Sequence, residues 1–236
     1  MAVTVTDPIA VMKRYEFKYH LSPSQTEFFK RRLEGRMEPD QFGLTTIASI
    51  YYDTPDYRLV RASIEKPLFK EKLRLRSYGT ATDTSPVFLE LKRKAYGIVY
   101  KRRIQTTVTQ VDKFFADDGI VTGGGQIDRE IAAFREHYPL LRPSCLIMYD
   151  RTAYFQPDGD LRLTIDANPR WRRDDLTLTG SMDGTPLLPP GWSILEVKVQ
   201  DAVPMWLAQT LSVGKIYKGS FSKYGEAYRQ QLGIAG

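Results

Sequence analysis

The sequence predicts an α+β fold in which antiparallel strands curl into a barrel beside flanking helices. Stretches that alternate strictly between apolar and polar residues recur along the chain, as in 72–76 and 88–92. Such alternation is typical of strands, whose successive side chains point to opposite faces. Short turns containing glycine or proline join three of these stretches in sequence, which indicates hairpins and antiparallel pairing. Capped amphipathic segments between them predict the helices.

The second face of these strands is mostly cationic. Leu73 and Leu75 face one way, whereas Lys72, Arg74 and Arg76 face the other. The same alternation recurs on six further stretches, whose polar members are Glu16, Lys18, Glu90, Lys92, Lys101, Arg103, Tyr149, Arg151, Arg162, Asp166, Glu196 and Lys198. Residues two apart on a strand lie roughly 7 Å apart, and two cations at that distance repel by roughly 2.4 kcal/mol at an effective dielectric of about 20.

Two interpretations of this cationic face are open. Any single stretch of this kind is usually a solvated strand face. If seven strands turn these faces toward one interior, however, the empty interior is strained and a polyanion relieves the strain. The recurrence along the chain favours the shared interior.

The length and composition limit the class of protein. The chain has 236 residues, which allows one domain with a real core or two small ones, and we expect one domain over 10–236 after a loose tail at residues 1–9. The net charge of +6 indicates an anionic partner. Its single cysteine, Cys145, lies in an apolar run and excludes an internal disulfide or a cysteine-rich zinc site. Two histidines make a histidine-based metal site unexpected. Neither a membrane-spanning run nor a signal peptide is evident, so we expect a cytoplasmic protein.

The elements follow in order from the local patterns. We expect strands at 14–21, 45–53, 68–78, 86–95, 98–109, 146–155, 161–166 and 192–199, with a further edge strand at 176–179. We expect helices at 23–35, 54–64, 110–117, 127–138, 203–213 and 221–232. The triplet 123–125 reads as a flexible connection. Ser222 is either a plain helix cap or, with Lys223, part of a phosphate site at the start of the last helix.

Short motifs in a fixed order give the chain a family resemblance. They are YEFKY (15–19), YYDTP (51–55), LRLRSYG (73–79), LELK (89–92), KRR (101–103), YDRTAY (149–154), RLTID (162–166), LEVK (195–198) and FSKY (221–224). Each alone is weak. Together they resemble the VTC-type polyphosphate polymerase domain of the triphosphate tunnel metalloenzyme superfamily, over about residues 14–228.

The resemblance implies an antiparallel eight-stranded β-barrel whose tunnel holds a triphosphate. It implies that phosphate is contacted by Lys18, Arg74, Arg76, Lys92, Lys101, Arg103, Tyr149, Arg151, Arg162, Lys198, Ser222 and Lys223. Of these, Arg74, Arg76, Lys92 and Arg151 would act in catalysis together with Glu196. Glu196 would be the main ligand of Mn²⁺ or Mg²⁺, with Glu90 a second ligand or a salt-bridge partner.

Two positions depart from the patterns of these relatives. The hydrolases and cyclases of the superfamily begin with Glu-x-Glu-x-Lys, whereas here Arg14 precedes Glu16 and Lys18. This favours the polymerase branch. The polymerases carry a basic residue at the position of Ser220, and Lys218 is the nearest substitute.

Three functions follow from the sequence. The first is transfer of the ATP γ-phosphoryl group to phosphate, pyrophosphate or polyphosphate. The second is metal-dependent hydrolysis of triphosphate or polyphosphate, and the third is polyphosphate binding without catalysis. Nucleic acid is not expected as a partner, because the aromatic residues are not interleaved with the cations as a stacking platform.

Overall fold

The computed structural model describes residues 15–65, 67–96, 98–117 and 121–234. The predicted tail at 1–9, Arg14 and the turn residue Gly97 lie outside these ranges, so the predictions made for them are not tested. None of the helices in the described ranges is long and apolar enough to cross a membrane.

Within the residues that the structure describes, one antiparallel sheet of 11 strands organises the chain, in the order β11-β1-β10-β8-β7-β3-β4-β5-β6, with β2 on β7 and β9 on β8. The longer strands are β1 (Tyr15–Leu21), β3 (Thr45–Asp53), β4 (Phe69–Tyr78), β5 (Val87–Ala95), β6 (Ile98–Thr106), β7 (Arg142–Phe155), β8 (Arg162–Arg172) and β10 (Ser193–Val199). The two-residue strands are β2 (Glu38–Pro39), β9 (Thr185–Pro186) and β11 (Lys218–Gly219).

The prediction of a closed eight-stranded barrel is wrong, because the sheet has 11 strands and stays open. Its order ends at β6 on one side and β11 on the other, and these two strands do not pair within the described ranges. The outer edge of β1 is already occupied where Lys18 and Tyr19 pair with β11. β6 is solvent-exposed along most of its length and carries consecutive cations, which repel a second cationic edge.

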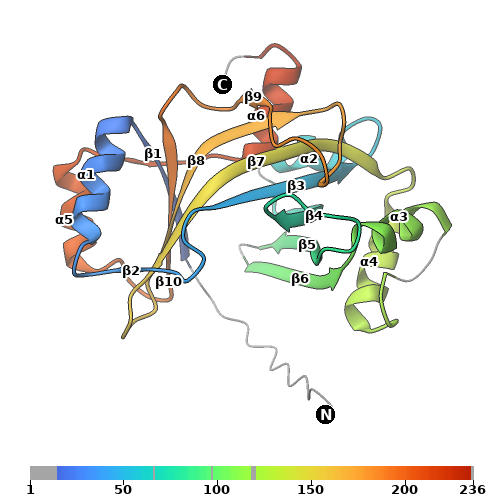
Figure 1. Cartoon of the computed structure of the whole chain (residues 1–236), viewed down its shortest axis with the longest axis horizontal. Helices are drawn as coiled ribbons and strands as arrows, with labels where there is room; N and C mark the ends of the chain where they lie inside the picture. Colours follow the sequence, from blue (N-terminus) through green and yellow to red (C-terminus); the bar gives the residue numbers. More distant parts are fainter. Residues whose placement is uncertain (1–14, 66, 97, 118–120, 235–236) are drawn as a thin grey trace.

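Helices flank the sheet, as Figure 1 shows. The described residues form six of them, and most match the prediction within a few residues. They are α1 (Pro23–Leu33), α2 (Arg58–Ile64), α3 (Val108–Asp117), α4 (Gln126–His137), α5 (Met205–Val213) and α6 (Lys223–Gln231). The predicted capping of α1 is confirmed: the Ser22 hydroxyl accepts from the backbone N–H of Gln25. The edge strand predicted at 176–179 is absent, and β9 pairs with β8 instead.

Two hydrophobic clusters cover the outer face of the curved sheet. One lies under α3 and α4 and includes Leu73, Leu89 and Phe134. The other lies under α1 and α5, at the opposite end of the molecule in Figure 1, and includes Phe29 and Leu195. Buried alternate residues of every long strand thus point outward into these clusters, which leaves their neighbours on the inner face.

The inner face divides into an apolar half and a charged half. The apolar half is a third cluster, formed by Ile47, Val60, Cys145, Ile147, Trp171, Leu187 and Ala227, and it is covered by α2 and α6. The predicted burial of Cys145 is confirmed at 2 % exposure. The charged half is formed by the predicted cationic faces of β1, β4, β5, β6, β7, β8 and β10, and it carries the candidate site.

Candidate functional site

The alternation in β4 places its basic residues as predicted. Leu73 and Leu75 are buried in the outer cluster, so Arg74 and Arg76 point to the inner face. Arg76 is only 5 % exposed. Its Nε donates to the Ser49 hydroxyl at 3.2 Å and its Nη2 to the Tyr149 hydroxyl at 3.1 Å. These bonds fix the guanidinium before any ligand arrives.

Glu90 gathers four predicted cations. Its carboxylate lies 2.7 Å from Arg74 Nη2 and 2.8 Å from Lys101 Nζ. Arg103 Nε lies 3.4 Å and Arg76 Nη1 3.8 Å from it. Burial alone would raise the pKa of Glu90, but these cations outweigh it and lower the pKa to about 2. Glu90 is therefore an ionised salt-bridge partner with both oxygens engaged.

Asp166 forms a second centre on the opposite side of the inner face. It is fully buried and accepts from Arg151 Nε at 2.6 Å and Arg151 Nη2 at 2.8 Å. Lys223, at the start of α6, also pairs with it. Burial would raise the pKa of Asp166, but Lys223 and Arg151 outweigh this effect and lower it. Asp166 thus holds Arg151 and Lys223 in place.

Glu196 lies beside this centre and is less tightly held. Its carboxylate is 3.2 Å from Lys18, 3.5 Å from Lys198 and 3.7 Å from Arg151. Burial would raise its pKa, but the surrounding cations, Lys18 first, lower it well below the ordinary value. Lys18 also lies 3.7 Å from Glu16 and donates to the Phe221 carbonyl. Glu196 is thus ionised, and its shortest ion pair, 3.2 Å, is longer than the shortest ion pairs of Glu90 and Asp166.

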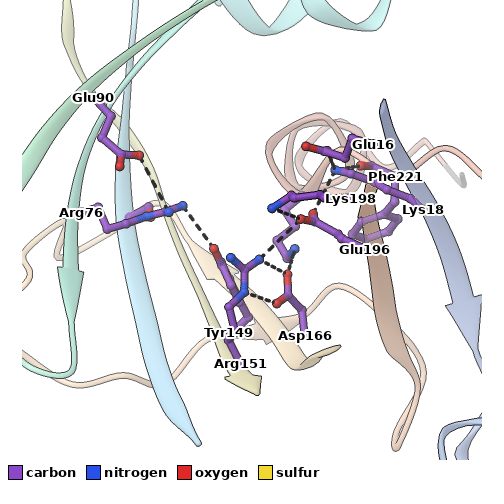
Figure 2. Close-up of polar contacts among 12 residues, drawn as sticks. Glu16, Lys18, Arg76, Glu90, Tyr149, Arg151, Asp166, Glu196, Lys198 and Phe221 are labelled. Carbon is purple, nitrogen blue, oxygen red and sulfur yellow. Dashed lines mark hydrogen bonds and ion pairs between the residues drawn. The ribbon is translucent and has the colours of Figure 1, made fainter. Parts of the chain in front are cut away.

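Tyr149 connects the two centres, as Figure 2 shows. Its hydroxyl accepts from Arg76 on one side. Its ring lies under the Arg151 guanidinium at 5.1 Å and under Lys223 Nζ at 4.3 Å. Arg76 and Glu90 therefore point toward Arg151 from one direction, while Lys198 and Glu196 point toward it from the other. The predicted residues from six separate strands and α6 converge.

Three predicted residues lie away from the two carboxylate centres. Lys92 is exposed and lies opposite Lys72 and Lys101 on the neighbouring strands, but it interacts electrostatically with Glu16 and Glu196 and so belongs to the charged half. Arg162 donates to the carbonyls of the turn between β7 and β8, at 3.1 to 3.4 Å, and has no recorded contact with the Glu90 or Asp166 centres. Ser222 caps α6 and also lies 3.1 Å from Lys72 Nζ.

The list of predicted site residues omitted three that belong to the charged half: Tyr51, Lys72 and Asp166. The hydroxyl of Tyr51 accepts from Arg74 Nη1 at 3.1 Å. Lys72 and Asp166 both carry the alternation signal, since each lies two positions from a predicted residue on its own strand. Tyr51 sits between apolar strand residues, so its polar role appears only in the fold.

Comparison of the chain with models of protein families identifies its family. The family model described as the VTC domain matches residues 13–232. The chain belongs to the VTC domain family. No curated protein sequence matches the chain significantly.

Solved structures share this VTC fold at low identity. A proposed adenylyl cyclase from Hippeastrum, described as having a dominant triphosphatase activity, is 17 % identical with a TM-score of 0.56. The match covers 93 % of this chain and 96 % of that one. A proposed adenylate cyclase from Bacillus halodurans is 13 % identical with a TM-score of 0.55, over 89 % and 96 % of the two chains. These likenesses concern the fold alone.

The acidic residues of the VTC domain differ in their suitability for a divalent metal. No group of three or more histidine, cysteine, aspartate or glutamate side chains forms a metal site within the described ranges. Cations face both oxygens of Glu90 and of Glu196, but they lie within 2.8 Å of Glu90 and no closer than 3.2 Å to Glu196. Glu196 therefore fits better: it is ionised and near Glu16 across Lys18, and one or two carboxylates suffice when substrate phosphates supply further ligands.

Proposed function

We propose that this VTC domain is a polyphosphate polymerase that transfers the ATP γ-phosphoryl group to phosphate, pyrophosphate or a polyphosphate end. The observation that carries the proposal is the charge of the inner face. Its carboxylates Glu90 and Asp166 are already paired with cations. Further basic residues from β1, β4, β5, β6, β7 and β10 surround them, so positive charge is in excess. A chain of phosphates matches this long cationic surface.

The arginines supply the main stabilisation of charge during transfer. Arg74 and Arg76 present planar guanidinium groups, which meet phosphate oxygens two at a time. Tyr51 and Tyr149 hold them by hydrogen bonds of 3.1 Å. Donors fixed in advance stabilise the charge that develops on the transferred group without reorganising.

The opposite side of the charged half binds and orients phosphates. Lys18 and Lys198 flank Glu196, and Arg151 and Lys223 are fixed by Asp166. Glu196, with Glu16, would hold Mn²⁺ or Mg²⁺, which supplies neutralisation of phosphate charge when bound. We assign no covalent enzyme intermediate, because the site contains no nucleophile with an adjacent base.

Hydrolysis of triphosphate or polyphosphate is the second candidate, with water as the acceptor. The dominant triphosphatase activity named for the Hippeastrum structure favours it. The same cations serve both reactions, so the difference lies in what occupies the acceptor position.

Sizing the products of the purified protein incubated with ATP and Mn²⁺ or Mg²⁺ tests the proposal. Long phosphate chains on a gel support the polymerase, whereas orthophosphate alone supports the hydrolase. If the protein binds polyphosphate tightly and forms neither product, the result supports a binding module without catalysis. Arg74→Ala should lower turnover by about 100-fold or more, while Arg102→Ala, on the outer face and paired with Glu130, should retain it.

A further inference from the structure

A separate cavity of about 330 Å³ lies where β3 ends and β7 begins. Thr54, Tyr57, Arg142, Ser144, Arg173 and Asp174 line it. None of these residues belongs to the charged half. The volume is at the lower end of the range of small-molecule pockets, about 300 to 1,000 Å³, which suits an ion or a small phosphorylated compound.

Two arginines give this cavity its character. Arg142, the first residue of β7, and Arg173, which follows β8, are exposed and make no hydrogen bond or ion pair within the described ranges, in contrast to Arg170 and Arg172 of β8. Arg170 Nε donates to the Met182 carbonyl at 2.6 Å, and Arg172 lies 3.1 Å from Asp175. Each guanidinium offers five donors that match phosphate oxygens. Asp174 is the only acidic lining residue, so the lining is net positive.

Hydrogen bonds connect the wall of the cavity to the first turn of α6. Ser144 Oγ lies 2.9 Å from the Tyr224 hydroxyl, which donates to Asp53 Oδ2 at 2.8 Å. Asp53 is fully buried and also accepts from the backbone N–H groups of Leu59 and Val60, at 2.8 and 3.0 Å. These bonds tie the first turn of α6 to the cavity wall.

The same turn of α6 carries site residues. Lys223 directly precedes Tyr224 and pairs with Asp166. The Tyr224 ring stacks on Tyr51 at 4.7 Å, and the Tyr51 hydroxyl accepts from Arg74. A displacement of Tyr224 therefore reaches both sides of the charged half.

We propose that this cavity is a second anion site, which binds inorganic phosphate or pyrophosphate between Arg142 and Arg173. Its occupancy changes the affinity of the charged half for a triphosphate through Ser144 and Tyr224. By linkage, a triphosphate in the charged half changes the affinity of the cavity by the same factor. The proposal concerns binding only and holds whether the domain polymerises or hydrolyses phosphate.

Calorimetric titration with orthophosphate, and separately with pyrophosphate, tests the site. We expect the wild-type protein to show a binding event that Arg142→Gln/Arg173→Gln weakens about tenfold or more. The control Arg31→Gln/Lys113→Gln removes the same charge from exposed positions on α1 and α3. It should bind orthophosphate and pyrophosphate as the wild type does. Unchanged binding of both anions by the cavity variant, with circular dichroism showing an intact fold, would overturn the proposal.

The connection to the charged half has its own test. The dissociation constant of tripolyphosphate is measured with and without orthophosphate. In the cavity variant, any change on adding orthophosphate comes from simple competition at the charged half. We expect the change in the wild type to differ from the change in that variant. Ser144→Ala should still bind the cavity anion but match the cavity variant in this shift. A Ser144→Ala protein with the wild-type shift contradicts the connection.

Discussion

The two halves of the inner face are built on the same strands but bury opposite kinds of residue. On β7, Cys145 and Ile147 lie in the apolar half, while Arg151, four positions beyond Ile147, lies in the charged half. The apolar half is covered by α2 and α6 and needs only close packing. The charged half buries Asp166 and Glu90 at 0 and 1 % exposure, which is stable only because each carboxylate is paired with several cations.

Tyrosines form the boundary between these halves. Tyr51 and Tyr149 pack in the apolar cluster through their rings and hydrogen-bond Arg74 and Arg76 through their hydroxyls. Tyrosine suits this position because one end is apolar and the other donates or accepts. The apolar half thus acts as a rigid support that orients the arginines of the site.

Removing the buried carboxylate of the charged half should have the largest effect on stability. Asp166→Asn leaves Arg151 and Lys223 buried without their counter-charge, so we expect the free energy of unfolding to fall by about 3 to 5 kcal/mol. Urea denaturation measures the loss. Asp150→Asn is the matched control on the outer face, where Asp150 pairs with Arg170 at 3.4 Å, and it should cost about 1 kcal/mol or less. Equal losses would contradict the distinction between the two faces.

A cavity in the apolar half should separate stability from affinity. Ile147 is 1 % exposed, so Ile147→Ala should lower the free energy of unfolding by about 2 to 4 kcal/mol. Its side chain contacts no phosphate in our assignment, so the affinity of the folded protein for tripolyphosphate should be unchanged at a temperature well below unfolding. A large loss of affinity in Ile147→Ala would show that the halves are coupled more tightly than the contacts indicate.

The fold could be predicted largely because alternation is a local signal. The residues that define β3 to β6 and their hairpins are close in sequence, and the boundaries agree within a few residues. Closure of the sheet is not local. It depends on whether β6 meets β1, and the short strand β11, which occupies the edge of β1, has no pattern of its own in two residues.

The candidate site shows the same division. Alternation identified which residues of each strand face inward, and the hydrogen bond from Arg76 on β4 to Tyr149 on β7 shows that side chains of strands that do not pair with each other come together there. It did not identify which cation pairs with which carboxylate. Asp166 shares a motif with Arg162, yet Asp166 binds Arg151 from the adjacent strand while Arg162 turns to the β7–β8 turn. Such pairings depend on register and on distances along the strand that no motif encodes.

Neighbouring residues on β6 offer a sharp test of which face binds phosphate. Arg103 lies 3.4 Å from Glu90 on the inner face, whereas Arg102 lies 2.9 Å from Glu130 on the outer face. We expect Arg103→Ala to weaken tripolyphosphate binding by about tenfold, since a charge-assisted contact contributes about 1.5 kcal/mol or more. Arg102→Ala should leave it unchanged. Similar losses in both variants, measured by calorimetry at constant ionic strength, would remove the assignment of the inner face.

The last expected effect, about as large as that of Arg103→Ala, concerns pH at the boundary of the two halves. Burial, opposed by Tyr51 and assisted by Lys70, Lys18 and Lys92, lowers the pKa of Lys72 to about 8. Burial would raise the pKa of Tyr51, but Arg74, Lys72 and Arg76 outweigh it and lower the pKa to about 8. Below this pH Lys72 is cationic and Tyr51 neutral. Above it Lys72 becomes neutral and Tyr51 anionic, so both changes disfavour a bound phosphate.

The affinity for tripolyphosphate should therefore fall between pH 7 and pH 9, by about tenfold or 1.4 kcal/mol. Tyr51→Phe/Lys72→Arg keeps the packing and a permanent positive charge, because arginine stays protonated throughout this range. The double variant should lose less affinity than the wild type over the same interval. Since ionisation of the ligand affects both proteins equally, their difference isolates the two side chains. Parallel curves for the two proteins would show that neither residue titrates in contact with the phosphate, and the boundary would then serve packing alone.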